Sequence, residues 1–224
     1  PVAAAPVAAA PAQVAANAGA ANATPPAAPP PPAYAPPPPP APPPSPAPPA
    51  VDQVWRVKIH KDDATLGKDD APVKVVILSG FGCQSCSDFA KDAKRLYGEY
   101  KGKVQFRFKH KIIPPQHPDS EQASEAAACA DKQGKFWEFH DKLMENPFNI
   151  GRAALEGYAK DLRLKTRTWT KCLDKHETYG ILTRDSVIAN ETGSHSFPNV
   201  LANGIRIGKP KNYDSLKALV DKQY

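Results

Sequence analysis

The stretch Gly82-Cys83-Gln84-Ser85-Cys86-Ser87-Asp88 carries two cysteines three positions apart, close enough for their thiols to form a disulfide with each other. Just before it, residues 73–78 are almost continuously apolar, which is typical of a strand buried on both faces of a sheet. Just after it, apolar residues recur every three or four positions up to Tyr100, which predicts a helix with one apolar face. The two thiols are therefore expected where a buried strand turns into a helix.

The position of each cysteine relative to that helix predicts its chemical role. Cys83 falls at or just before the first helical turn, where unpaired backbone N–H groups and the positive end of the helix dipole favour a negative charge. A thiolate is stabilised at such a place and becomes the better nucleophile and leaving group. Cys86, one turn further along, is expected to be the more sheltered partner that resolves a mixed disulfide.

The first fifty residues have a composition that cannot build a core. Residues 1–50 hold 20 of the 27 prolines, no charged residue and little besides alanine. Such a segment lacks the amide donors of regular hydrogen-bonded structure, so we predict a disordered Pro/Ala-rich tether over residues 1–50. The remaining residues, 51–224, suit one globular domain.

The charge pattern argues against a nucleic-acid-binding protein. The formal net charge is +6, but lysines are interspersed with acidic residues and no motif that reads RNA or DNA accompanies them, so we expect a solvated mixed surface. No apolar run reaches the roughly eighteen residues of a membrane-spanning helix. Because the chain begins on Pro1 and not on a methionine, we expect a fragment or a processed product, with any membrane attachment coming from a signal or anchor segment upstream.

The order of predicted elements defines the fold class. An alternating strand over residues 54–59 and a charged loop over 61–70 precede the buried strand, the helix and a second sheet strand over 104–108. Several helices then occupy about residues 115–192, with Gly180 as a break. A hairpin around Asn203-Gly204 follows, and Asp214 is expected to cap the last helix. A βαβ half, a helical insertion and a ββα half make an α/β, thioredoxin-like fold.

Four segments of the globular part form a recognisable combination. They are Ala71-Pro72-Val73 leading to Phe81-Gly82-Cys83-Gln84-Ser85-Cys86, then Phe108-Lys109-His110, then residues 133–140, and finally residues 193–200 followed by Asn203-Gly204. Over roughly residues 52–222 this combination resembles the DsbA-like family of thiol-disulfide oxidoreductases in the thioredoxin superfamily, whereas a lone C-x-x-C would be a weak signal.

The resemblance implies a substrate-binding site and also reveals two departures from the family pattern. Pro198 aligns with a proline whose preceding peptide bond is cis and faces the thiol pair, so that the backbone of Phe197 offers an edge for an extended substrate chain. Gln84 stands where the family often has proline. Ile77, six residues before the first cysteine, stands where many members carry a buried carboxylate that relays protons. Proton transfer from Cys86 would then need water or another base.

The other two cysteines, Cys129 and Cys172, fall on the apolar faces of predicted helices. Their positions alone allow two buried thiols or one disulfide within the helical insertion. The resemblance to family members with an extra bridge, together with the even number of cysteines, favours a structural disulfide. Four paired cysteines would fit an oxidising compartment.

The function predicted from the sequence is thiol-disulfide exchange with cysteine-containing protein substrates, with Cys83 as the nucleophile and Cys86 as the resolving residue. The reaction would need no metal and no cofactor beyond the redox-active Cys83–Cys86 disulfide. A membrane-bound or soluble redox partner would recycle the pair, and the location would be extracytoplasmic, in a bacterial periplasm or cell envelope. The direction of electron transfer stays open.

Two other classes of function use the same residues. A non-catalytic peptide-binding module would hold cysteine-containing peptides at the edge formed by Phe197 and Pro198, and replacing Cys83 with serine would leave it intact. A metal carrier would hold zinc or copper on Cys83, Cys86 and a histidine. A zinc ribbon needs a second close cysteine pair, whereas the other two cysteines lie 43 residues apart.

Overall fold

The computed structural model describes residues 57–112, 119–193, 197–208 and 212–223, with the side chains of residues 206–208 excepted. The predicted tether over residues 1–50 lies outside these ranges, as do residues 54–56 of the predicted first strand.

A mixed sheet of five strands forms the centre of the described domain, in the order β1-β3-β2-β4-β5. The bounds are Thr65–Leu66 for β1, Val73–Ser79 for β2, Val104–His110 for β3, Asn199–Ala202 for β4 and Ile205–Gly208 for β5. β2 and β3 run parallel, and the other neighbouring strands run antiparallel. β2 is flanked on both sides, which fits its nearly continuous apolar sequence.

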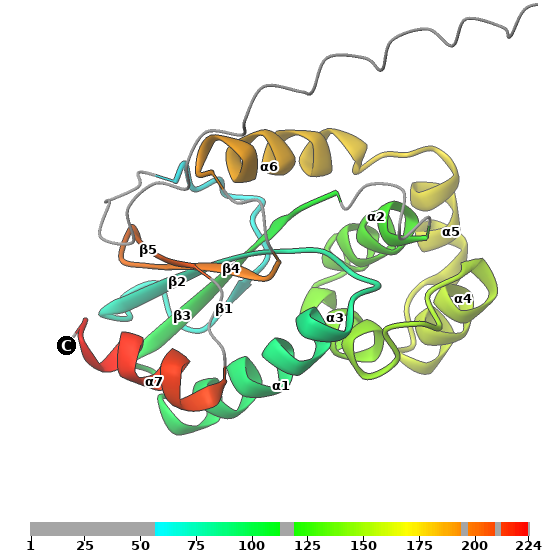
Figure 1. The fold of residues 1–224 in the computed structure, drawn as a ribbon. Coiled ribbons are helices and arrows are strands. Elements are labelled where there is room, and N and C mark those ends of the chain that lie inside the picture. The colour runs from blue at the N-terminus through cyan, green and yellow to red at the C-terminus, as the bar shows by residue number, and fades with distance from the viewer. Residues whose placement is uncertain (1–56, 113–118, 194–196, 209–211, 224) are drawn as a thin grey trace, which may run out of the picture. The chain divides into compact units, whose positions relative to one another are not determined.

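Helices cover both faces of this sheet and extend from one end of it (Figure 1). α1 (Gln84–Glu99) and α7 (Tyr213–Asp221) lie on one face, and α6 (Tyr179–Glu191) lies on the other. The remaining helices gather beside the sheet and are α2 (Ser120–Asp131), α3 (Phe136–Glu145), α4 (Arg152–Asp161) and α5 (Thr166–Asp174). Helices α2 to α6 all fall between β3 and β4, as expected for a helical insertion.

The alternating side chains of β2 divide the core into two clusters. Val73, Val75 and Ile77 belong to a large cluster that continues through α1 into the inserted helices. Val76 and Leu78 point to the opposite face, where they pack with residues of α6 and β4. Because successive side chains of a strand point to opposite faces, one apolar run fills both layers.

Three details of the predicted elements were wrong. Residues 57–60 form no strand, and the edge strand β1 lies instead in the segment predicted as a charged loop, paired with β3. The break between α5 and α6 comes before Thr178, so Gly180 lies inside α6. The last helix is capped by Asn212, whose side chain accepts the backbone N–H of Ser215, and not by Asp214.

The predicted hairpin turn is confirmed. Asn203 and Gly204 both have positive φ, 47° and 82°, as the tight turn of a two-residue hairpin requires. The Asn203 side chain also accepts the backbone N–H of Lys74 at 2.8 Å, which ties the turn to the start of β2. None of the helices in the described ranges combines the length and the apolar character needed to cross a membrane.

Candidate active site

The two cysteines of the C-x-x-C stretch lie at the N-terminus of α1, directly after β2. Cys83 is the N-cap residue, and its extended backbone (φ −124°, ψ 137°) turns the chain from strand to helix. A disulfide joins Cys83 to Cys86, with their Cα atoms 5.3 Å apart. The Cys83 sulfur also accepts the backbone N–H of Cys86 at 3.2 Å. The same N–H also lies 3.2 Å from the Cys83 carbonyl oxygen, and the sulfur acts as the side-chain acceptor of an N-cap residue.

Burial distinguishes the two sulfur-bearing residues. Cys83 is half-buried, whereas Cys86 has no exposed surface. No acidic residue lies in the first turn of this described helix, so no side chain there offsets its positive dipole end. The site can therefore accept attack at Cys83 and can stabilise a negative charge on its sulfur, while Cys86 stays sheltered.

The loop before β4 meets the cysteine pair, although the two are more than a hundred positions apart in the chain. The peptide bond between Phe197 and Pro198 is cis. The hydroxyl of Ser85 donates a hydrogen bond to the Phe197 carbonyl oxygen at 3.3 Å, and its oxygen lies 3.7 Å from the Cys83 sulfur. The structure thus brings together all four residues predicted for the site, and it adds Ser85, whose contact only the fold reveals.

A positive charge lies near the same loop. The ammonium nitrogen of Lys111 is 5.9 Å from the centroid of the Phe197 ring, and it contacts the side-chain oxygen of Asn190. Burial lowers the pKa of the Lys111 amine below its usual range.

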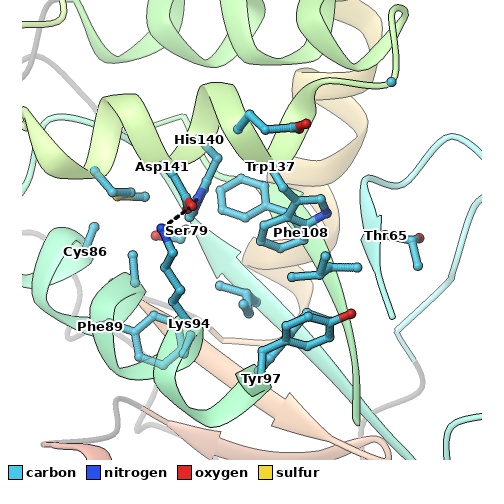
Figure 2. A pocket seen from close by; sticks show the side chains of 18 residues that line it. Thr65, Ser79, Cys86, Phe89, Lys94, Tyr97, Phe108, Trp137, His140 and Asp141 are labelled. Carbon is cyan, nitrogen blue, oxygen red and sulfur yellow. Dashed lines mark hydrogen bonds and ion pairs between the residues drawn. The ribbon is translucent and has the colours of Figure 1, made fainter. Parts of the chain in front are cut away.

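A cavity of about 490 Å³ lies behind the cysteine pair, between α1, α3 and the sheet. Figure 2 shows the side chains around it, with Cys86 at one side and Ser79, His140 and Asp141 beside it. Ile77 lines the cavity and is paired with Phe108 of β3, so the position expected for a buried carboxylate in the family is apolar. His140 of α3 also lines the cavity and was not predicted as a site residue. The signal was a polar residue within an otherwise apolar helical face.

The second cysteine pair lies in the inserted helices, on α2 and α5. A disulfide joins Cys129 of α2 to Cys172 of α5, with Cα atoms 5.9 Å apart. Both residues are almost fully buried, at 1% and 3% exposure. Thr178 lies 3.8 Å from the Cys129 sulfur.

Metal binding gains no support from the arrangement of the side chains. Within the described ranges, no three His, Cys, Asp or Glu side chains gather closely enough to hold a metal ion.

Comparisons with known proteins relate this domain to disulfide chemistry. A family model described as Thioredoxin matches residues 60–222. The "Probable disulfide bond formation protein D" of Bacillus cereus is 32% identical, over 71% of this chain and 77% of its own. The crystal structure of oxidised BdbD from Bacillus subtilis, 28% identical, superposes with a TM-score of 0.66 over 78% of this chain and 97% of that one. These likenesses confirm the predicted fold class.

Another relative is a far longer protein. The Na(+)/H(+) antiporter NhaA 3 of Salinispora tropica is 30% identical over 70% of this chain, but the match covers only 24% of the antiporter. The chain therefore spans about a quarter of the length of this curated relative.

Proposed function

Because this chain belongs to the thioredoxin family, and within it to the DsbA-like disulfide oxidoreductases, we propose that its domain exchanges disulfides with cysteine-containing proteins through Cys83 and Cys86. One observation carries the proposal. A disulfide lies at the N-terminus of α1 with one half-exposed and one buried cysteine. A thiolate attacks the sulfur that it can reach, here that of Cys83, and a Cys83 sulfur whose negative charge is stabilised is also a good leaving group when the mixed disulfide is cleaved.

The proposed reaction runs in either direction. In the donor direction, a substrate thiolate attacks Cys83, the Cys83–Cys86 bond breaks and Cys86 leaves as a thiolate. A second substrate thiolate then attacks the substrate sulfur of the mixed disulfide and releases Cys83 as a thiolate and the substrate as a disulfide. In the reverse direction, the Cys83 thiolate attacks a substrate disulfide and Cys86 resolves the mixed disulfide. The half-exposure of Cys83 supports its role as the residue that meets substrate.

Phe197 and Pro198 are proposed to hold the substrate chain. The Phe197–Pro198 peptide bond is cis, and the Phe197 carbonyl accepts a hydrogen bond from Ser85, which lies between the two cysteines in the sequence. A backbone carbonyl next to the reacting sulfur gives an extended peptide a partner for its own N–H groups. Contacts to backbone atoms would let substrates of many sequences bind.

The domain boundaries, the role of the second disulfide and the cellular location are part of the same proposal. Residues 51–224 form the catalytic domain, with the insertion at about 115–192, and residues 1–50 serve as its tether. Cys129 and Cys172 serve as a structural disulfide. Since all four cysteines are paired, we place the protein outside the cytoplasm, in a bacterial periplasm or cell envelope, where a membrane-bound or soluble redox partner recycles the pair.

A redox titration of Cys83 and Cys86 against glutathione, together with an insulin-reduction assay, tests the proposal. We expect reversible exchange that Cys83→Ser abolishes. Cys86→Ser should instead accumulate a mixed disulfide on Cys83, because the resolving thiol is missing. An unmutated protein that exchanges with neither glutathione nor insulin would exclude the oxidoreductase, and a peptide-binding activity that survives Cys83→Ser would favour the non-catalytic module.

A further inference from the structure

The buried position of Cys86 poses a problem of proton transfer. When Cys86 resolves a mixed disulfide its thiol must lose a proton, and when it leaves as a thiolate it must gain one. With no exposed surface, Cys86 cannot exchange that proton directly with bulk water. The strand position where the family often carries a buried carboxylate offers no acid or base either, because Ile77 is paired there with Phe108.

A cavity whose lining includes Cys86 separates this residue from the exposed side chains of α1 and α3. Its volume of about 490 Å³ is large enough for several waters, and Ser79, His140 and Asp141 give it polar lining. Lys94 and Glu138 also line it, and their side chains are 64% and 47% exposed. The lining of the cavity thus includes the fully buried residue Cys86 at one side and groups in contact with water elsewhere.

Among the groups around the cavity, His140 has a ring that can take up a proton at one nitrogen and release it from the other. Its ring packs against aromatic side chains and its Nδ1 lies 3.2 Å from an Asp141 carboxylate oxygen. A carboxylate beside an imidazole fixes the tautomer and orientation of the ring and stabilises the imidazolium. Histidine is also the side chain that ordinarily changes its charge between pH 5 and 8.

Three other charged groups that line the cavity, Asp141, Lys94 and Glu138, have pKa values shifted in the direction that favours their charged form. Burial opposes ionisation of Asp141, but hydrogen bonds from His140 and Lys94 outweigh it and hold the pKa of this carboxyl below its usual range. The hydrogen bond to Asp141 raises the pKa of Lys94 above its usual range, so the amine stays charged. Glu138 is partly buried, yet the ammonium of Lys135 keeps its pKa low. Tyr97 also lines the cavity, from α1.

A second histidine, His110, lies near His140 and belongs to the sheet. His110 of β3 is fully buried, and burial lowers its pKa to about 3, with a contribution from the nearby His140. His110 therefore stays neutral near pH 7 and does not compete for the proton.

We propose that His140, oriented by Asp141, exchanges protons with Cys86 through water in this cavity, in place of a buried carboxylate. The inference rests on the proposed function. In resolution, the Cys86 S–H bond breaks as the Cys83–Cys86 bond forms and the substrate sulfur leaves Cys83 with the electron pair. The proton passes to the neutral His140 ring and from there to solvent. In the donor direction, imidazolium returns a proton to the Cys86 thiolate.

Stopped-flow reaction of the reduced protein with oxidised glutathione separates the two steps. Attack by Cys83 depends on glutathione concentration, whereas resolution by Cys86 does not. We expect His140→Gln to slow resolution at least about tenfold at pH 7. The rate of Cys83 attack should stay within about twofold of the unmutated protein. His176→Gln, which changes an exposed histidine elsewhere, is the control for both rates.

Two further variants separate a proton path from a structural effect. Ile77→Glu, added to His140→Gln, places a carboxylate on the same cavity wall and should restore resolution. Ala93→Leu narrows the cavity from α1 without changing His140 and should slow resolution alone, so it tests the path even where His140→Gln fails to fold. Unchanged resolution in either folded single variant overturns the proposal, as does an equal slowing of both steps. An unmutated protein that does not react at all would instead count against the proposed function.

Discussion

The Ser85 hydroxyl donates its hydrogen to the Phe197 carbonyl oxygen at 3.3 Å while its oxygen lies 3.7 Å from the Cys83 sulfur. A hydroxyl has one hydrogen to donate, so these two acceptors compete for it. In the disulfide form the carbonyl is the better acceptor. After reduction, a Cys83 thiolate would be the stronger acceptor because hydrogen bonds to charged groups are the strongest ones. Reduction would then turn Ser85 toward the sulfur and free the Phe197 carbonyl for substrate.

Replacing Ser85 with alanine should therefore make the protein a weaker oxidant. Loss of a donor to the thiolate destabilises the reduced form, and we expect the glutathione equilibrium constant to change by about tenfold, equivalent to about 1.4 kcal/mol. The thiolate absorbance at 240 nm should also appear at a higher pH. Ser85→Thr keeps the hydroxyl and is the matched control. An alanine variant that behaves like the threonine variant in both measurements would show that Ser85 does not contact the thiolate.

The buried disulfide between Cys129 and Cys172 should contribute stability and leave exchange unaffected. Closing a loop of 43 residues stabilises by about 4 kcal/mol in the chain-entropy model, so the double alanine variant should lose about that much in urea unfolding while it still reduces insulin. Under native conditions, dithiothreitol should expose two thiols quickly and the other two only with denaturant, since both residues are buried. Four thiols released at one rate, or a loss of exchange in the folded double variant, would contradict this division.

The sequence predicted most of the elements because the hydrophobic period and turn residues are local signals. The nearly continuous apolar run of β2 predicted a buried strand, and Asn203-Gly204 predicted a hairpin turn. The position of the cysteine pair was predicted from the buried strand before it and the helix after it. The contact of Ser85 with Phe197 could not be predicted, because it depends on how β4 pairs with β2. The edge strand β1 was missed for a similar reason. Its two residues, Thr65–Leu66, are strand only through their pairing with β3.

A buried ion-pair cluster between β3 and α6 gives a prediction about stability. Lys109 is fully buried, with its ammonium 2.5 Å from Asp63 and 3.3 Å from Asp185. Arg184 contacts the same two carboxylates from a partly exposed position. Lys109→Met would leave two buried carboxylates with one cation between them. Removing one partner of a buried ion pair costs about 3 to 5 kcal/mol, and we expect a loss of that size in urea unfolding at pH 7.

An exposed lysine on the adjacent strand provides the control for this cluster. Lys74 of β2 is exposed and its ammonium donates to the Asp69 carbonyl, so Lys74→Met should change the free energy of unfolding by less than about 0.5 kcal/mol. If Lys109→Met cost no more than the control, Arg184 alone would be enough to balance the two carboxylates.

Acid sensitivity should come from His110, whose pKa burial lowers to about 3 in the folded protein. Its unfolded pKa is about 6.5, so between pH 6.5 and 3 the unfolded state binds one more proton than the folded state, and stability falls as the pH falls. The slope attributable to this residue is about 1.4 kcal/mol per pH unit at full difference. His110→Phe keeps a ring among the aromatic neighbours Phe108 and Phe136 and cannot titrate. Urea unfolding at pH 7 and 4.5 should therefore show the unmutated protein losing about 2 to 3 kcal/mol more than this variant. Parallel losses in the two proteins would mean that His110 is protonated in the folded state or reached by water.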